Sequence, residues 1–305
     1  LLENDRVLLV CEGLDTLATL TLNGHELGWT ENMFRQYEWE VKSLIKVDGE
    51  NYLTITFSSP VKYISAKNAV REMPTPYHSI PGGPYLRKAP CQFGWDWGPK
   101  LPTIGVWKNI YLAGRSEARL ADVQLKQIHK DGRVSVEMRV KADQWGSLPL
   151  KIFIDIQGPI DRFDQEKVRV HRESAINEKG EALVSISIPA PALWWPNGYG
   201  DHPLYKVEVS LLTGSDNSTV VDQDTYDIGL RTIELRQEED QWGRSFTFVV
   251  NGVPILAKGS NWIPAESMPE RHTGASLDML IASAAESHQN MLRVWGGGFY
   301  EDEYF

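Results

Sequence analysis

Cysteine is scarce in this 305-residue sequence, which contains only Cys11 and Cys91, far apart along the chain. A disulfide framework or a zinc site needs more cysteines at closer spacing, so the sequence excludes both. We interpret the two thiols as small, buried apolar side chains. A run of about 20 consecutive apolar residues is also missing, which excludes a membrane-spanning helix and a membrane partner.

Basic residues are in deficit as well. The 31 Lys and Arg residues are outnumbered by 41 Asp and Glu residues, which gives a formal net charge of -10. Nucleic-acid binding depends on Lys and Arg surfaces that release counterions, so this balance argues against a nucleic-acid partner. The seven histidines form no metal-spaced pair, and no nucleotide-binding or zinc-protease motif occurs. We therefore predict no cofactor and no metal, and a neutral substrate fits the charge balance.

Tryptophan, in contrast, is abundant, with 11 copies. Large aromatic side chains fill the cores of β-sandwiches, and their flat apolar rings also stack on the C–H faces of sugars. We expect both uses, for different tryptophans.

The first part of the chain has the pattern of short strands. Apolar alternation and turn signals predict strands at residues 7–11, 16–22, 37–41, 51–57 and 106–112. The pair Asn23-Gly24 is a strong hairpin signal. Residues 60–105 lose the alternation and collect Pro, Gly and aromatic residues, so we predict a long ordered loop there. Such a loop inside a compact domain is more often functional than idle. The first domain is predicted for residues 1–116.

A second all-β rhythm follows. Strands are predicted at residues 123–129, 134–140, 150–156, 182–188, 205–211 and 225–233. Their spacing is typical of an immunoglobulin-like β-sandwich, which we assign to residues 117–234. This region contains no grouping of catalytic residues.

The pattern changes again after Glu234. A hairpin at Asn251-Gly252 leads into residues 258–262, and the apolar residues between Leu277 and His288 then recur at helical spacing, with Ser276 as the expected N-cap. A buried strand at residues 291–295 follows. Strand, helix and strand without alternation indicate a parallel βαβ unit. A (β/α)8 barrel takes about 250 residues, so we predict that residues 235–305 begin a barrel that this chain does not complete.

The loop at residues 87–99 contains the densest group of binding residues. Asp96 stands between Trp95 and Trp97, and the segment is shaped by Gly and Pro. Such an arrangement suits a sugar, because the rings stack on it while the carboxylate accepts hydrogen bonds from two hydroxyl groups. The alternative is a rigid aromatic corner in which Asp96 bonds its own turn.

A second group lies at the ends of the two predicted barrel strands. Alternation sends Arg293 and Trp295 to the same side of their strand, and Asn261 and Trp262 end the preceding one. Barrel enzymes place their active sites at these ends. The alternatives are layer packing inside the barrel, or a phosphate-binding loop at residues 296–298, for which the accompanying lysine is missing.

Four segments resemble the β-mannosidases of glycoside hydrolase family 2, and they occur in a consistent order over nearly the whole chain. They are residues 93–99 (FGWDWGP), 194–200 (WWPNGYG), 258–265 (KGSNWIPA) and 290–298 (NMLRVWGGG). The Trp-Asp-Trp segment favours a mannosidase over a galactosidase or a glucuronidase.

The resemblance implies a mostly β architecture: a jelly-roll sugar-binding domain, then the immunoglobulin-like sandwich, then the start of the barrel. It implies hydrolysis of terminal, non-reducing β-D-mannose with retention of configuration, by two Glu residues. Both lie on later barrel strands, so the chain as given is expected to be inactive. Four glutamates near the first two strands match neither position and receive no catalytic role: Glu266, Glu270, Glu301 and Glu303.

What the resemblance transfers to this chain is binding of a β-mannoside oligosaccharide. It implies that Trp95 and Asp96 reach from the first domain towards the mouth of the barrel. Arg293 and Trp295 would line the floor, with Arg293 orienting a catalytic carboxylate, and Asn261 and Trp262 are further binding candidates.

Two other functions stay open from the sequence. One is a non-catalytic carbohydrate-binding module, and the other is a family 2 β-galactosidase or β-glucuronidase. The chain begins at Leu1 without a methionine, so we expect the native N-terminus to be missing. The resemblance implies earlier strands before Val7, so we expect the first domain to lack a strand or more. We favour a cytoplasmic location, with a secreted or lysosomal one as the alternative if a leader was removed.

Overall fold

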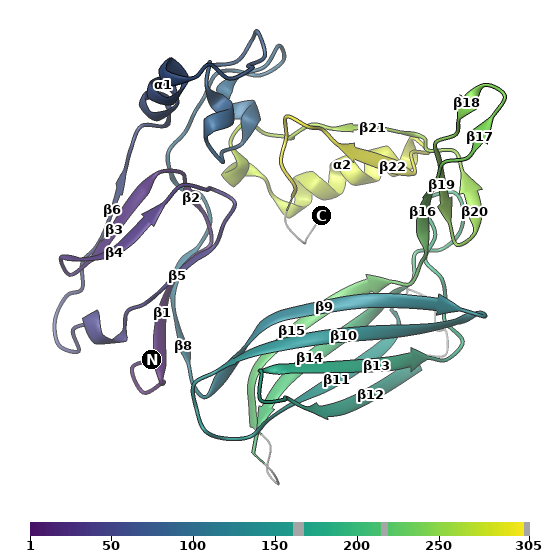
Figure 1. Ribbon diagram of the computed structural model, residues 1–305, viewed down its shortest axis with the longest axis horizontal. Coiled ribbons are helices and arrows are strands. Elements are labelled where there is room, and N and C mark those ends of the chain that lie inside the picture. Colours follow the sequence, from purple (N-terminus) through teal and green to yellow (C-terminus); the bar gives the residue numbers. More distant parts are fainter. Residues whose placement is uncertain (161–167, 215–218, 302–305) are drawn as a thin grey trace. The chain divides into compact units, whose positions relative to one another are not determined.

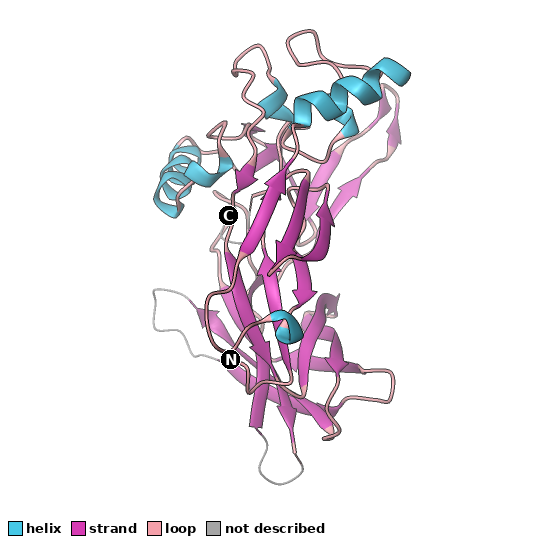
Figure 2. Cartoon of the chain, turned by 90° about the vertical axis from the view of Figure 1, so that its left-hand side faces the viewer, coloured by secondary structure: helices cyan, strands magenta, loops and turns pink. Residues whose placement is uncertain are grey.

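The computed structural model describes residues 1–160, 168–214 and 219–301 of the chain. Its contacts divide the chain into two compact units (Figure 1). The first contains Leu1–Gly114, Gly259–Glu286 and the chain from Leu292 onward, and the second contains Arg115–Lys258 and Ser287–Met291. Strands greatly outnumber helices among the described elements (Figure 2), which confirms the predicted mostly β fold class.

The first unit contains a β-sandwich of two three-stranded sheets. One has the order β5-β1-β8 and the other β4-β3-β6. Their bounds are β1 Arg6–Cys11, β3 Ala18–Leu22, β4 His25–Thr30, β5 Tyr37–Glu40, β6 Leu53–Phe57 and β8 Ile110–Arg115. Val7, Leu9 and Cys11 of β1 share one core with Leu20 and Leu22 of β3, because alternate residues of each strand point inward.

Turn chemistry fixes the register of this sandwich. Asn23 and Gly24 join β3 to β4 with φ angles of 52° and 84°, a combination that Asn-Gly adopts readily. A short two-stranded sheet, β2 (Leu14–Asp15) with β7 (Gly105–Val106), completes the strands of the sandwich region.

The segment 60–105, predicted as a loop, is in part helical, so that prediction was too simple. It begins with α1 (Pro60–Val70), whose N-cap Ser59 accepts a hydrogen bond from Lys62 N. Two short 3-10 helices follow, η2 (Gly83–Tyr85) and η3 (Pro90–Phe93). The helix escaped the pattern because only Pro60 and Ile64 of α1 are buried, which leaves no apolar stripe to recognise.

The second unit is dominated by a larger β-sandwich, with sheets of order β13-β10-β9 and β12-β11-β14-β15. The bounds are β9 Ala118–Lys130, β10 Arg133–Gln144, β11 Leu150–Ile160, β12 Val168–Ala175, β13 Glu181–Ile188, β14 Leu204–Thr213 and β15 Thr219–Gly229. Its core is built from alternate Val, Ile and Leu residues of both sheets. The edge strand β12 was not predicted, because its sequence is highly charged.

Five further strands belong to the second unit. They are β16 Ile233–Arg236, β17 Glu239–Asp240, β18 Gly243–Arg244, β19 Thr247–Val250 and β20 Val253–Ile255. The segment 194–200 is anchored to them: Asn251 Nδ2 donates to Trp194 O (3.0 Å), and Leu256 N donates to Tyr199 Oη (3.3 Å). Its role in this unit is therefore structural. The division of the chain at residues 116 and 234 stays a prediction.

The last elements are β21 (Gly259–Trp262), α2 (Gly274–Glu286) and β22 (Met291–Val294), and the two strands are hydrogen-bonded neighbours. Asn290 N donates to Lys258 O (2.8 Å) and Trp295 N donates to Trp262 O (3.0 Å), so the pairing advances in the same direction along both strands. This order agrees with a strand–helix–strand unit. Its place in a barrel stays a prediction.

The start of α2 differs from the expectation. Thr273 Oγ1 accepts from Ser276 N (3.2 Å) and Ser276 Oγ accepts from Thr273 N (3.2 Å). The N-cap is thus Thr273, and Ser276 returns the bond from the third helical position, as in a capping box. In the described ranges, no helix has the length and apolar character to cross a bilayer. Glu303 lies outside the described residues.

Candidate functional site

The loop that carries Trp95 is fixed by backbone hydrogen bonds on two sides. Ile80 N donates to Phe93 O (2.8 Å), and Leu101 N donates to Gln92 O (2.9 Å). The first bond ties η3 to the segment before it, and the second ties η3 to the segment that follows. The turn at residues 94–98 therefore projects from a braced base.

Gly94 sets the direction in which the chain leaves η3. Its φ is 102°, and a Cβ at this position would lie 2.5 Å from Lys100 Cγ and 3.0 Å from His78 O. Both the backbone angle and the lack of space require glycine. The next residue, Trp95, starts from this defined geometry.

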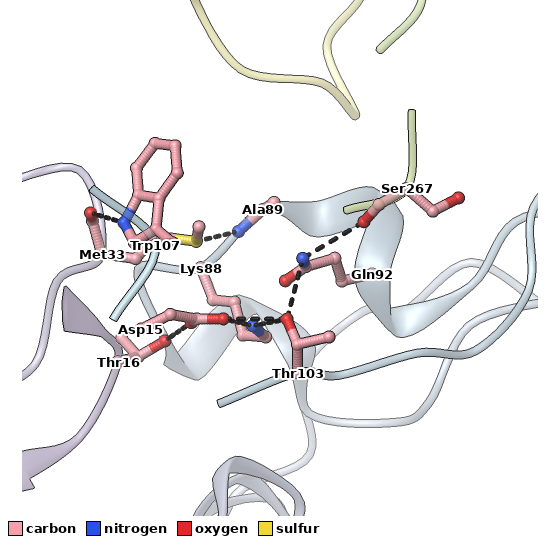
Figure 3. Close-up of polar contacts among 9 residues, drawn as sticks. All are labelled: Asp15, Thr16, Met33, Lys88, Ala89, Gln92, Thr103, Trp107 and Ser267. Atoms are coloured by element: carbon pink, nitrogen blue, oxygen red, sulfur yellow. Dashed lines mark hydrogen bonds and ion pairs between the residues drawn. The ribbon is translucent and has the colours of Figure 1, made fainter. Parts of the chain in front are cut away.

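A buried polar network lies beneath the loop (Figure 3). Lys88 Nζ forms an ion pair with Asp15 Oδ2, and the two side chains are 0% and 4% exposed. Thr103 Oγ1 donates to the same carboxylate oxygen (3.0 Å), and Gln92 Nε2 donates to Thr103 Oγ1 (3.1 Å) and to Ser267 O (3.2 Å). The network thus joins β2, the loop and the segment between β21 and α2.

Burial lowers the pKa of Lys88, and the charge of Asp15 and its hydrogen bond partly oppose that shift. Two charges removed from water are stable only when paired and hydrogen-bonded. Asp15 meets this condition with Lys88 and Thr103, and Thr16 Oγ1 also donates to it.

The two cysteines are buried, at 0% and 3% exposure for Cys11 and Cys91. Burial raises the pKa of each thiol to about 11. Since the thiolate is the reactive form, only about one thiol in a thousand is ionised at pH 8. We expect iodoacetamide to label both peptides at least about a hundredfold more slowly in the native protein than in urea, by mass spectrometry. Rapid native labelling of Cys91 would mean that the loop beside it opens.

Two tryptophans of this loop contact a third, Trp295, from a distant part of the chain. The ring of Trp295 contacts Trp95 edge to face (centroids 5.1 Å apart, 73°) and Trp97 at 5.8 Å and 66°. Asp96 lies between the two loop tryptophans and is exposed. Both of its chain neighbours contact Trp295, so the backbone at Asp96 is carried between two rings that pack on one indole.

Glycine lets Trp295 fold back over its own chain. A Cβ on Gly297 would lie 2.2 Å from Trp295 Cη2, so any side chain there would displace the indole. Gly298 N donates to Trp295 O (3.0 Å) and closes the turn. This part of the Gly296–298 run therefore positions an aromatic ring.

Arg293 and Asn261 are joined directly. Arg293 Nη1 donates to Asn261 Oδ1 (3.0 Å), and both side chains are exposed. The bond fixes the guanidinium beside Trp295 without neutralising it, because an amide oxygen carries no charge. Its other N–H groups are suited to orienting a carboxylate.

Trp262 points elsewhere. It is 7% exposed, and its Nε1 donates to Glu301 Oε1 (3.0 Å). Glu301 Oε2 lies 3.3 Å from His272 Nδ1, and these two side chains are 7% and 9% exposed. Trp262, Glu301 and His272 thus form a buried polar group behind the strands.

A cavity of about 1330 Å³ collects most of these residues. Its wall contains seven aromatic side chains and several cationic or amide ones, and among the described lining residues none is acidic. The aromatic residues are Phe34, Phe93, Trp95, Trp107, Trp295, Phe299 and Tyr300; the polar side chains include Arg87, Lys108, Asn261 and Arg293. The aromatic rings can stack on a sugar ring, and the polar side chains can hydrogen-bond its hydroxyl groups.

Of the six predicted binding residues, the structure brings Trp95, Asn261, Arg293 and Trp295 into this one cavity. Asp96 is exposed on the loop beside it, and Trp262 is buried next to Glu301. The prediction that these residues bind substrate stays a prediction.

Sequence reasoning did not find Phe34 and Trp107 on the cavity wall. Their rings are 6.3 Å apart at 85°, and Trp107 Nε1 donates to Met33 O (2.8 Å; Figure 3). Lys108 Nζ lies 4.8 Å from the Trp107 ring centre. The 11 tryptophans were a signal, but nothing in the pattern separated Trp107 from a core residue.

Two parts of the chain match known protein families. Residues 1–108 match the family described as glycosyl hydrolase 2 galactose-binding domain-like, and residues 118–231 match glycosyl hydrolases family 2. The chain belongs to glycosyl hydrolase family 2.

Within the described residues, no group of His, Cys, Asp and Glu side chains could hold a metal ion.

The individual relatives with the higher sequence identity are β-mannosidases. The chain is 35% identical to β-mannosidase B of Aspergillus clavatus and 36% identical to that of Thermothelomyces thermophilus, over 98% and 99% of its length. It spans about a third (35%) of these relatives. The crystal structure of the Dictyoglomus thermophilum β-D-mannosidase matches all of this chain, over 37% of that protein, with a TM-score of 0.85 and 34% identity.

A more distant structure shares the fold alone. The β-glucuronidase of Bacteroides uniformis has a TM-score of 0.65 at 14% identity, over 98% of this chain and 32% of that protein.

Proposed function

We propose that this chain is the sugar-binding front part of a retaining β-mannosidase, which releases terminal, non-reducing β-D-mannose. The observation that carries the proposal is the meeting of Trp95 and Trp295 beside Arg293 in one cavity. Trp95 comes from the loop of the first sandwich and Trp295 from the end of β22, so two separate parts of the chain supply one sugar-sized aromatic corner.

Each side chain then has a definite task. The Trp95 and Trp295 rings, set at 73°, contact two faces of a pyranose. The Asp96 carboxylate accepts hydrogen bonds from two adjacent hydroxyl groups and so selects the configuration of the sugar. Arg293, held by Asn261, orients a carboxylate that takes part in the reaction.

The chemistry itself needs two carboxylates about 5 Å apart, one acid/base and one nucleophile. No acidic side chain is among the described residues that line the cavity. We therefore expect the 305-residue chain alone to hydrolyse nothing, and the enzyme that carries it to be active.

A panel of aryl glycosides tests the proposal. The full-length enzyme is assayed with the 4-nitrophenyl β-D-mannoside, β-D-galactoside, β-D-glucoside and β-D-glucuronide. We expect kcat/KM for the mannoside to exceed the others by at least about a hundredfold, because a site built to bond a hydroxyl group rejects its epimer strongly.

Two results would overturn the proposal. A preference for the galactoside or the glucuronide would assign another family 2 activity. Binding of mannosides without any turnover by the full-length protein would make it a non-catalytic carbohydrate-binding module.

A further inference from the structure

A second hollow, of about 610 Å³, lies on the first sandwich and shares no lining residue with the cavity above. It is bordered by the sheet β4-β3-β6 and by the start of α1. Its lining residues are Leu17, Ala18, Thr19, Trp29, Thr30, Ser58, Ser59, Lys62 and Tyr63. Trp29, on the edge strand β4, is 63% exposed.

Strand register places Trp29 in a row of hydroxyl groups. On β3, Thr19 pairs with Trp29 of β4 on one side and with Thr56 of β6 on the other. Ala18 and Leu20 are buried, so alternation sends Thr19 and its two partners to the outer face. The indole therefore stands at the end of a cross-strand row of two threonines, on exposed backbone positions.

The residues around this row are also polar, and hydrogen bonds fix two of their hydroxyl groups. Ser59 Oγ accepts from Lys62 N at the start of α1 (3.3 Å), and Thr30 Oγ1 donates to Thr16 O (2.8 Å). The exposed Ser58 and Lys62 add further hydrogen-bonding groups to the rim. An indole that is open to solvent on a rigid sheet, next to hydroxyl and ammonium groups, matches the two sides of a sugar: C–H faces and hydroxyl edges.

We infer that this hollow is an auxiliary carbohydrate-binding site for an uncharged oligosaccharide. The hollow would hold an inner part of a polysaccharide. The end of the same polysaccharide, or of another one, would occupy the cavity of Trp95 and Trp295. The choice of a mannan as the ligand rests on the proposed function; the site itself does not.

The chemistry of the hollow favours a sugar over other partners. A stable protein interface covers about 800 Å² on each partner and has several buried apolar anchors. Here Trp29 is the one large apolar side chain of the described lining that is exposed. The net charge of -10 disfavours a nucleic acid.

Affinity electrophoresis of the full-length enzyme tests this site. The protein is run in native gels with and without soluble linear β-1,4-mannan, and the apparent Kd is taken from the retardation. We expect Trp29→Ala to raise the apparent Kd for the mannan about tenfold, because the ring contact is lost. Its kcat/KM for an aryl β-mannoside, which fills only the other cavity, should stay within about twofold of the parent value.

Two further variants complete the test. Trp242→Ala removes a tryptophan that is 85% exposed on the β17–β18 hairpin, and it should be retarded like the parent. Trp29→Phe keeps an aromatic ring and should be retarded to an intermediate degree. Unchanged retardation of Trp29→Ala, or an equal loss in Trp242→Ala, would overturn the inference. Failure of the proposed function would appear separately, as absent turnover of the aryl mannoside.

Discussion

Replacing Asp96 with alanine is expected to lower kcat/KM of the full-length enzyme for an aryl β-mannoside by about a thousandfold. A hydrogen bond to a charged group contributes about 1.5–3 kcal/mol, and we propose that Asp96 makes two of them to adjacent sugar hydroxyls. The loss should fall on kcat as well as on KM, because a ring that is held less firmly reaches the reactive geometry less often.

The position of Asp96 supports an effect of this size. It lies between Trp95 and Trp97, and both of those rings contact Trp295. The backbone beneath is braced on two sides, at Phe93 and at Gln92, so the turn that carries Asp96 starts from a fixed base. A rigid group loses less entropy on binding than a mobile one.

Two companion variants make the result specific. Asp96→Asn keeps the shape but removes the charge, and it should lose about tenfold to a hundredfold. Asp48→Ala removes an exposed aspartate of the same unit and should leave kcat/KM unchanged. If Asp96→Ala retained more than about a tenth of the activity, the carboxylate would not bind the sugar and would only hydrogen-bond the backbone of its own turn.

The fold could be predicted from sequence wherever one face of a strand is buried. In β13 the buried and exposed residues alternate over Glu181–Ile188, and each buried residue is apolar, although the apolar Leu183 is exposed. The helix α1 offered no such stripe, since only Pro60 and Ile64 are buried. A start signal was nevertheless present, because Ser59 before Pro60 is a favoured N-cap and first-turn pair.

The site could be predicted only in part, for a geometric reason. Alternation predicted that Arg293 and Trp295 share a face, and both line the cavity. The same rule separates Asn261 from Trp262, because adjacent strand residues point to opposite faces. Asn261 accordingly lines the cavity, and Trp262 bonds Glu301 behind it.

Contacts between distant segments are beyond a local pattern. Met33, Ala89 and Cys91 form a small buried cluster on which Trp107, Trp295 and Phe299 pack. No periodicity links these segments, and only the folded chain brings them together. Phe34 joins them through contacts with Trp107 and Phe299, at centroid distances of 6.3 and 6.0 Å.

The largest loss of stability is expected from Lys88→Met, at about 3–5 kcal/mol, because it leaves the buried Asp15 carboxylate without its cation. The change is measured as the shift in the urea midpoint of the transition that includes the first sandwich, followed by tryptophan fluorescence. Arg271→Met, in the same unit, is the matched control. Its ion pair with Glu266 spans 3.5 Å with side chains 65% and 33% exposed, so its loss should cost less than about 1 kcal/mol.

A double variant separates the charge from the packing. Asp15→Asn removes the negative charge and leaves an oxygen that accepts from Thr103. Combined with Lys88→Met, it should restore at least about 2 kcal/mol, because no unpaired charge remains. If the double variant were as unstable as Lys88→Met alone, the cost would lie in the shape of the lysine stem. The network also holds Gln92 against Ser267. If Trp95 depends on this base for its position, the activity of the same variants should fall in proportion to their loss of stability.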